Sequence, residues 1–222
     1  MYLKDKNILF IHIPKTCGKL ITNNMARNSN IYYYGHYPFK IWKDLYPDIN
    51  KTTKIFTFIR NPWDKMISLY IYSLKNHRKI VPWFSQDDNI DLDFNNWLKW
   101  NYIENIENLK KSAWPNTKTN SVEMVGNFEL NFSNQTNLLS YENGNFNKNI
   151  KIIKYEDFCK NNNIITEYFN KNKLLNYDFE RKINTSHHEH YSKYYNDESI
   201  QLIKKYFSLD IERFNYKFET IS

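Results

Sequence analysis

Two segments of this chain each join an apolar, strand-like run to a helix-like stretch through a basic residue. The first covers residues 10–19 and changes character at Lys15, and the second covers residues 56–70 and changes character at Arg60. A cation at a strand end, beside the unpaired N–H groups of a helix N-terminus, makes an anion-binding site. Two such sites in one small chain predict a ligand with two separated phosphate-like groups.

The spacing of apolar residues predicts short strands that alternate with helices. We expect strands at residues 7–13, 31–34, 54–59 and 149–154. We expect helices at residues 18–28, 38–46, 92–101, 156–171 and 197–207, and one that begins at Pro62. Residues 1–7 are charged and are expected to lead directly into the first strand, and residues 210–218 are expected to pack on the core. Strands alternating with helices favour an α/β fold around a parallel sheet.

The helix after Arg60 has clear start signals. Asn61 suits the N-cap, Pro62 suits the first helical position, and Asp64 suits the first turn. A stripe at helical spacing is expected to face the core: Trp63, Ile67, Tyr70, Ile71 and Leu74. Ser68 lies roughly 100° from that stripe, so it is expected to face something other than the core.

Length, charge and cysteine content limit the possible classes of protein. We interpret residues 1–222 as one domain with an insertion around residues 79–148. The net charge of +7 favours acidic ligands, although a generic basic surface has the same charge. The two cysteines, Cys17 and Cys159, imply no disulfide framework and favour a reducing compartment. No signal peptide or membrane-spanning apolar run is visible, so we expect a cytoplasmic protein without a membrane span.

The first basic segment, Pro14-Lys15-Thr16-Cys17-Gly18-Lys19, has the chemistry of a phosphate-binding loop. Lys15 supplies a compact charge, Thr16 offers a hydroxyl donor, and Gly18 permits close approach of the backbone to a phosphate. A plain strand-to-helix turn with solvated lysines is the alternative interpretation. The segment is not a Walker A loop, because it has no leading glycine and Leu20 stands where a Mg²⁺-binding Ser or Thr is needed.

Together, Pro14-Lys15-Thr16-Cys17-Gly18-Lys19-Leu20 and Arg60-Asn61-Pro62 with Ser68-Leu69-Tyr70 resemble two motifs of a known family. These are the phosphosulfate loop and the 3′-phosphate motif of sulfotransferases that use 3′-phosphoadenosine 5′-phosphosulfate (PAPS). The branch that this chain resembles contains heparan sulfate 2-O-sulfotransferases and bacterial carbohydrate sulfotransferases. The resemblance implies a P-loop NTPase-like three-layer fold, with a central parallel β-sheet flanked by helices, and PAPS as co-substrate without a metal.

By the same resemblance, the loop from Lys15 to Leu20 binds the donor. Lys15 contacts the sulfuryl group and its bridging oxygen, and the residues after it wrap the 5′-phosphate: Thr16, Cys17, Gly18, Lys19 and Leu20. Two residues depart from the family pattern. Cys17 replaces a usual glycine and Leu20 replaces a usual small hydroxyl residue, so one side-chain hydrogen bond to the phosphate is expected to be missing, which Lys19 could replace.

The second motif implies that Arg60 holds the 3′-phosphate bidentately while Ser68 donates a hydroxyl bond. A capped helix with an unused arginine is the alternative. Lys65 stands where the family more often has arginine and is expected to be a flanking charge. Three further matches are weaker. Asn184-Thr185-Ser186 with Tyr191 and Tyr194-Tyr195 resembles a segment that closes over the adenine and 3′-phosphate, so Asn184 and Ser186 are expected donor contacts. Residues 210–216 resemble the family's ending, with Asn215 in place of glycine, and residues 153–158 resemble a strand-then-helix entry; both are expected to be structural.

His36 is the candidate catalytic base. It follows a predicted strand between the two motifs, and an imidazole can accept a proton at neutral pH. The resembling enzymes have a similar Gly-His here and another histidine two residues earlier, where this chain has Tyr34. A partly buried structural histidine is the alternative for His36, and His12 is interpreted as a satisfied core residue. Residues 187–190 contain three histidines, but their spacing fits no strong zinc pattern, so no metal is expected.

The sequence therefore predicts a PAPS-dependent sulfotransferase that acts on a hydroxyl acceptor, with a glycan or glycolipid as the expected partner. His36 would deprotonate the acceptor, and Lys15 would neutralise the leaving oxygen. Insertion 79–148 would shape the acceptor side. Two alternatives stay open. A nucleoside or small-molecule kinase would need Mg²⁺ and a hydroxyl in place of Leu20. A nucleic-acid-binding module would need a basic and aromatic stripe, whereas the informative cations here sit at strand ends.

Overall fold

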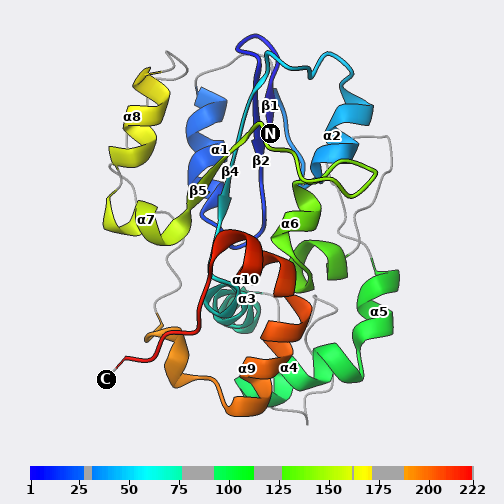
Figure 1. Cartoon of the computed structure of the whole chain (residues 1–222), viewed down its shortest axis with the longest axis vertical. Coiled ribbons are helices and arrows are strands. Elements are labelled where there is room, and N and C mark those ends of the chain that lie inside the picture. The colour runs from blue at the N-terminus through cyan, green and yellow to red at the C-terminus, as the bar shows by residue number, and fades with distance from the viewer. Residues whose placement is uncertain (28–31, 77–92, 113–126, 162, 172–187, 222) are drawn as a thin grey trace. The chain divides into compact units, whose positions relative to one another are not determined.

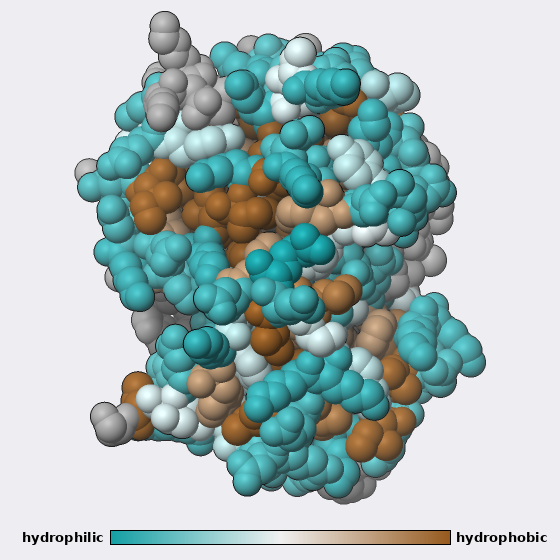
Figure 2. Space-filling model, in the orientation of Figure 1, coloured by the Kyte–Doolittle hydropathy of each residue, from teal (hydrophilic) through white to brown (hydrophobic). Residues whose placement is uncertain are grey.

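The computed structural model describes residues 1–27, 32–76, 93–112, 127–161, 163–171 and 188–221. The described residues form two compact units. The first lies within Met1–Arg60 and Asn137–Thr185, and the second within Asn61–Thr117, Ser121–Thr136 and Ser186–Ser222. Each unit is considered by itself. Hydrophilic residues cover most of the face seen in Figure 2, as a mean hydropathy of −0.75 leads one to expect.

The first unit is built on a five-stranded mixed sheet with the order β3-β1-β2-β4-β5 (Figure 1). Its strands are β1 (Tyr2–Leu3), β2 (Ile8–Ile11), β3 (Tyr32–Tyr33), β4 (Lys54–Ile59) and β5 (Ile150–Lys154). Strands β2, β4 and β5 are parallel, with Phe10 opposite Phe56 and Phe56 opposite Lys151. The predicted α/β class and the predicted strand positions are confirmed.

The expectation that the whole sheet is parallel is wrong at β1. This strand runs antiparallel to both β2 and β3. The charged residues before β2 make a tight hairpin rather than a lead-in, because Asn7 adopts a φ of +53° and its N–H donates to the Lys4 carbonyl. Asparagine tolerates this left-handed conformation better than most residues. The chain therefore folds back and pairs residues 2–3 with residues 8–9.

Helices cover one face of this sheet. They are α1 (Gly18–Arg27), α7 (Tyr155–Lys160) and α8 (Asn163–Lys171), whose side chains join those of the strands in one buried cluster: Leu3, Ile8, Phe10, Ile21, Met25, Phe56, Phe58, Ile153, Phe158, Ile165 and Phe169. Tyr2 alternates with Leu3, so its ring lies on the other face, where it contacts Tyr46 at the end of α2 (Phe39–Leu45). The sheet is thus flanked by helices, as predicted.

The predicted helix at 156–171 is two helices rather than one. Helix α7 ends at Lys160, and Asn161 adopts an extended conformation while its side chain accepts a hydrogen bond from the Asn163 N–H. Asparagine competes for backbone hydrogen bonds in this way and favours helix ends. Helix α8 then starts at Asn163.

The second unit is helical in its described part. It contains α3 (Pro62–Asn76), α4 (Phe94–Ile103), α5 (Ile106–Lys111), the π-helix η1 (Phe128–Phe132), the 3₁₀-helix η2 (Tyr191–Lys193), α9 (Asp197–Tyr206) and α10 (Ser208–Phe214). The short α6 (Gln135–Leu138) joins the units in sequence. Residues 79–148, predicted to be an insertion, contain α4, α5, η1 and α6, together with parts outside the described residues. No helix among those described is long and apolar enough to cross a membrane.

Helix α3 starts as the sequence predicts. The Asn61 side chain accepts a hydrogen bond from the Trp63 N–H at 3.0 Å, which is the expected N-cap contact. The buried face differs in part from the predicted stripe. Trp63 and Ile67 are buried and are joined by Met66 and Leu69, whereas the three later members of the stripe are only half-buried.

Lys65 corrects the expectation of a flanking surface charge, because its side chain is 0% exposed. Its Nζ donates to the carbonyls of Leu130 and Asn131 in η1, at 3.5 and 3.0 Å. Burial lowers the pKa of Lys65 to about 8, partly offset by the nearby Asp210 carboxylate. The ammonium therefore connects α3 to η1 within the second unit instead of serving as a surface cation.

The first part of segment 210–218, which was expected to pack on the core, belongs to helix α10. Asp210 within it is buried, and its carboxylate accepts hydrogen bonds from the backbone and side chains of Gln135 and Thr136 at 2.7–3.2 Å. Asn215 ends the helix with a φ of +52°. This left-handed position is one that glycine adopts most readily, which explains why a glycine is usual there in the resembling family.

Candidate functional site

The residues after four strands of the first unit meet at one edge of the sheet. Strands β2, β4 and β5 are parallel, and β3 shares their direction because β1 is antiparallel to both β2 and β3. The segments that follow these strands are 12–17, 34–36, Arg60 and Tyr155. Ligands of open α/β sheets bind outside the carboxyl ends of the strands. This edge is therefore the candidate site, and it carries Lys15, His36 and Arg60 as the sequence predicts.

The backbone of the loop after β2 is shaped for an anion. Lys15 and Cys17 have φ values of +66° and +72°, with Thr16 between them, and helix α1 begins directly afterwards at Gly18. Left-handed residues in such a turn can direct successive N–H groups toward one concavity, which is a recurrent phosphate-binding arrangement. The left-handed conformation of Cys17 also explains why glycine is usual at this position in the resembling family.

The side chains of Thr16, in the loop, and Leu20, in α1, make contacts within the protein. The Thr16 hydroxyl is buried and donates to the Ile13 carbonyl at 2.8 Å, whereas the sequence led us to expect a donor to phosphate. Leu20 packs against the buried cluster beneath α1, and its N–H donates to the Cys17 carbonyl. Thr16 and Leu20 therefore shape and anchor the loop. Between them in the sequence, burial raises the pKa of the Cys17 thiol to about 12.

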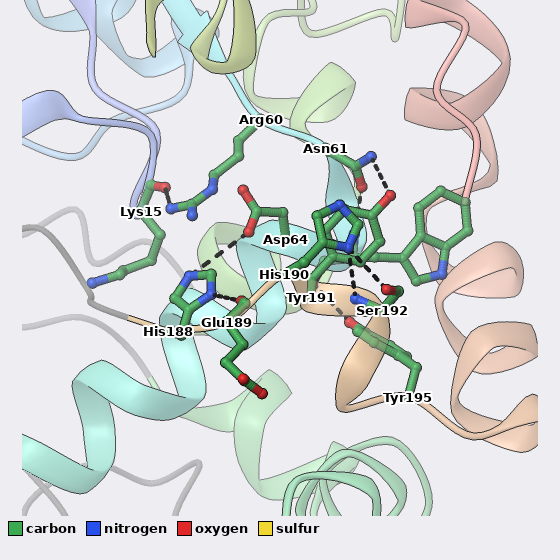
Figure 3. A network of polar contacts seen from close by, with 11 residues as sticks. Lys15, Arg60, Asn61, Asp64, His188, Glu189, His190, Tyr191, Ser192 and Tyr195 are labelled. Carbon is green, nitrogen blue, oxygen red and sulfur yellow. Dashed lines mark hydrogen bonds and ion pairs between the residues drawn. The ribbon is translucent and has the colours of Figure 1, made fainter. Parts of the chain in front are cut away.

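Arg60 and Lys15 lie close together at the ends of β4 and β2. Arg60 is 5% exposed, and its Nη1 donates to the Lys15 carbonyl at 3.1 Å (Figure 3). Burial and, to a smaller extent, the Arg60 charge lower the pKa of Lys15 to about 7. Two partly desolvated cations that repel each other form a site whose electrostatic energy an anion would lower.

Tyr155 is a residue of this site that the sequence analysis regarded only as part of a structural match. The guanidinium carbon of Arg60 lies 4.3 Å from the centre of the Tyr155 ring, in a cation–π contact. Tyr155 is the first residue after β5, so its place in the chain matches those of Lys15 and Arg60 after their strands. That shared position after a parallel strand was the available signal.

His36 makes hydrogen-bonding contacts with Tyr34 and with the backbone of His12. Its Nε2 is 3.1 Å from the Tyr34 hydroxyl, and its Nδ1 is 3.3 Å from the His12 carbonyl oxygen. Burial lowers the pKa of His36 to about 4 and also lowers that of His12 well below its usual value. Both rings are therefore neutral near pH 7, and the two ring centres are 4.1 Å apart.

Gly18 makes room for His12. A Cβ atom at this position would overlap the His12 imidazole. The glycine therefore lets the His12 ring pack against the first turn of α1, in addition to any close approach of a phosphate to the loop. His12, interpreted from sequence as a satisfied core residue, is buried and also contacts Tyr34 and His36.

The other predicted site residues belong to the second unit or lie outside the described residues. Ser68 is buried in α3, and Asn184 and Ser186 lie outside the described residues. The Tyr191 hydroxyl accepts a hydrogen bond from the Asn61 side chain (Figure 3) and another from the Glu219 N–H. The Tyr195 hydroxyl donates to the Trp63 carbonyl. These tyrosines fasten the C-terminal segment to the start of α3 within this unit.

The histidines near residue 190 make protein contacts. His188 Nε2 is 3.7 Å from an Asp64 carboxylate oxygen, and His190 Nδ1 is 2.8 Å from the Ser192 hydroxyl (Figure 3). His187 lies outside the described residues. Within the described ranges, no three or more His, Cys, Asp or Glu side chains are grouped so that they could hold a metal ion.

Comparison with known proteins identifies one family. The family model described as "Sulfotransferase family" matches residues 1–217, which is nearly the whole chain. No curated protein and no solved structure matches the chain.

The Gly18→Ala variant tests the packing of His12. The added methyl group overlaps the imidazole, so we expect the free energy of unfolding to fall by about 1–3 kcal/mol, as for overpacked cores. Urea denaturation measures this change. Lys19→Ala, one position further along α1, is the control and should change stability by less than about 0.5 kcal/mol. Equal stability of the two variants would show that His12 does not need the space at Gly18.

Proposed function

This chain belongs to the sulfotransferase family, and we propose that it transfers a sulfuryl group from PAPS to a hydroxyl of a glycan or glycolipid. The observation that carries the proposal is the pairing of Lys15 and Arg60 at neighbouring strand ends, beside the left-handed loop residues and the start of α1. In this proposal the sheet, the loop and α1 form a P-loop-like core that binds the donor.

Arg60 is proposed to hold the 3′-phosphate of the donor. Its position is supported from two sides, by the Lys15 carbonyl and by the Tyr155 ring. A guanidinium fixed in this way loses little side-chain freedom when it binds a phosphate bidentately. Ser68, Asn184 and Ser186 stay predicted donor contacts from the sequence motifs.

Lys15 is proposed to act on the group that leaves. The acceptor oxygen forms a bond to sulfur while the bond between sulfur and the 5′-phosphate oxygen breaks, so negative charge grows on that bridging oxygen. A preorganised cation at the point where charge develops stabilises the transition state. Fixed cations of the protein, without a metal ion, are proposed to supply this charge, and His36 is proposed to take up the acceptor proton.

The environment of Leu20 favours sulfuryl transfer over the kinase alternative. Leu20 packs against the buried cluster at the position where a Walker A loop has the hydroxyl that binds Mg²⁺. A kinase of that type would lack this ligand here.

Transfer from PAPS labelled on sulfur to a panel of desulfated polysaccharides and glycolipids tests the function. We expect Lys15→Ala to lower turnover by about 100-fold or more, the cost typical of removing a group that stabilises transition-state charge. Arg60→Ala should instead raise the dissociation constant for the donor and have a smaller effect on turnover. Lys15→Arg and Arg60→Lys are the charge-preserving controls. If both alanine variants change turnover and donor binding equally, the two roles are wrongly assigned.

Donor binding should also depend on pH through Lys15. Because the pKa of Lys15 is about 7 without ligand, Lys15 is neutral in most molecules at pH 8.5. Binding of an anion then requires Lys15 to take up a proton. We expect the affinity for 3′-phosphoadenosine 5′-phosphate (PAP), the desulfated product, to fall between pH 7.5 and 9. Calorimetry in two buffers with different ionisation enthalpies measures the proton uptake. Lys15→Arg keeps its charge and should abolish the trend. The same trend in both proteins would contradict this origin.

The Tyr155 ring should contribute to donor affinity through Arg60. A cation–π contact is worth about 0.5–2 kcal/mol, so Tyr155→Leu should weaken PAP binding by roughly 2- to 30-fold. Tyr155→Phe keeps the ring and should bind PAP about as tightly as the unmodified protein. Tyr168→Leu, which removes a ring packed on Phe56, is a control for general loss of core packing. If Tyr155→Leu binds PAP normally, the stack has no role in donor binding.

A further inference from the structure

Three polar side chains from two strand ends form a connected group in the first unit. The Tyr34 hydroxyl lies 3.1 Å from His36 Nε2 and 3.3 Å from His12 Nδ1. His36 Nδ1 lies 3.3 Å from the His12 carbonyl oxygen. The Tyr34 hydroxyl therefore contacts both imidazoles. On His36 it contacts Nε2, the ring nitrogen that does not face the His12 carbonyl.

The backbone contact determines which nitrogen of His36 carries the proton. A carbonyl oxygen can only accept a hydrogen bond, so Nδ1 must be the donor toward His12. His36 is neutral near pH 7, since burial lowers its pKa to about 4. In a neutral imidazole with a protonated Nδ1, the lone pair lies on Nε2. The atom able to accept a proton is thus the one that Tyr34 contacts.

The tautomer of His36 determines the direction of the two hydrogen bonds that Tyr34 makes with His36 and His12. Tyr34 has one hydroxyl hydrogen, and it donates this hydrogen to Nε2 of His36. The Tyr34 oxygen can then only accept from His12, so His12 also carries its proton on Nδ1. The chain of bonds therefore runs from His12 through Tyr34 to His36, and the lone pair of the proposed base is covered by the Tyr34 O–H group.

We propose that the Tyr34 hydroxyl is the group that receives the acceptor proton and that it passes its own proton to His36. This proposal rests on the proposed sulfotransferase function. As the acceptor oxygen bonds to sulfur and the bridging S–O bond breaks, the acceptor proton moves to the Tyr34 oxygen. The Tyr34 proton moves to Nε2 of His36 at the same time. The products are a sulfate ester, PAP and a protonated His36, which then releases its proton to water.

The phenol oxygen has the capacity that this step needs. It has two lone pairs, of which one accepts from His12 and the other can accept from an acceptor hydroxyl. Burial raises the pKa of Tyr34, so the phenol holds its proton at neutral pH. Because one proton arrives as the other leaves, no phenolate has to form. His12 is fixed by its packing against Gly18 and keeps the phenol oriented.

The hydrogen-bond chain can be tested on the ligand-free protein by long-range ¹H–¹⁵N correlation of the histidine rings. We expect the proton of both His12 and His36 on Nδ1 at pH 7. Tyr34→Phe removes the donor to Nε2, so the pKa of His36 should rise by about one unit. The His12 carbonyl and the N-terminal ammonium of Met1, which also affect the pKa of His36, are the same in both proteins. A proton on Nε2 of His36, or an unchanged pKa, would overturn the proposal.

The relay itself is tested by transfer from sulfur-labelled PAPS to the same acceptor panel. Tyr34→Phe should lower turnover by about 100-fold or more, the usual contribution of a positioned acid–base group. Its dissociation constant for PAP should stay within about twofold of that of the unmodified protein. Tyr34→His should recover at least a tenth of the lost turnover, because an imidazole can also donate and accept.

The outcomes distinguish failure of the proton relay from failure of the proposed sulfotransferase function. Undiminished turnover of Tyr34→Phe, with normal PAP binding, would overturn the relay and leave direct proton transfer to His36. Loss of turnover in Tyr34→Phe without recovery in Tyr34→His would point to a structural role and would also overturn it. If the unmodified protein binds no PAP, the proposed function fails, and the relay fails with it.

Discussion

The common direction of four strands is the constraint on which the candidate site depends. Strands β2, β3, β4 and β5 all end at one edge of the sheet, so residues distant in sequence follow one another along that edge. Lys15, Arg60 and Tyr155 come together because each follows a parallel strand. His36 reaches the same edge because β3 is antiparallel to β1 and β1 is antiparallel to β2, so β3 runs in the same direction as β2.

This edge combines two electrical environments. Around Arg60 and Lys15 it is cationic. Burial and, to a smaller extent, repulsion from Arg60 destabilise the charged form of Lys15 in the absence of ligand. Around the buried His12 and the half-buried Tyr34 and His36 it is neutral, and the three side chains are joined by hydrogen-bonding contacts. The first environment suits a ligand with phosphate groups, and the second suits the movement of a proton. A sulfuryl transfer needs both, and in the proposal each is supplied by a separate set of residues.

Local sequence signals predicted the parts of the structure that depend on neighbouring residues. Strand β4 and the cap of α3 at Asn61 are as expected, because apolar runs and capping residues act over a few positions. The hairpin at Asn7 and the helix break at Asn161 were missed because each depends on one asparagine taking a special conformation in a chain rich in asparagine. Cys17 and Asn215 stand where the resembling family usually has glycine, and both have a positive φ. The backbone at these positions therefore has the conformation that favours glycine. The burial of Lys65 and the contact of Tyr34 with His12 arise from tertiary packing, which no local pattern in the sequence reports.

In the proposed function, the paired cations of this edge recognise a nucleotide with a separate 3′-phosphate. Calorimetric titration of the unmodified protein with PAP and with ADP, each with and without Mg²⁺, tests it most directly. We expect PAP to bind tightly without Mg²⁺ and ADP, which lacks the 3′-phosphate, to bind far more weakly. Equal binding of the two nucleotides, or binding that requires Mg²⁺, would contradict it.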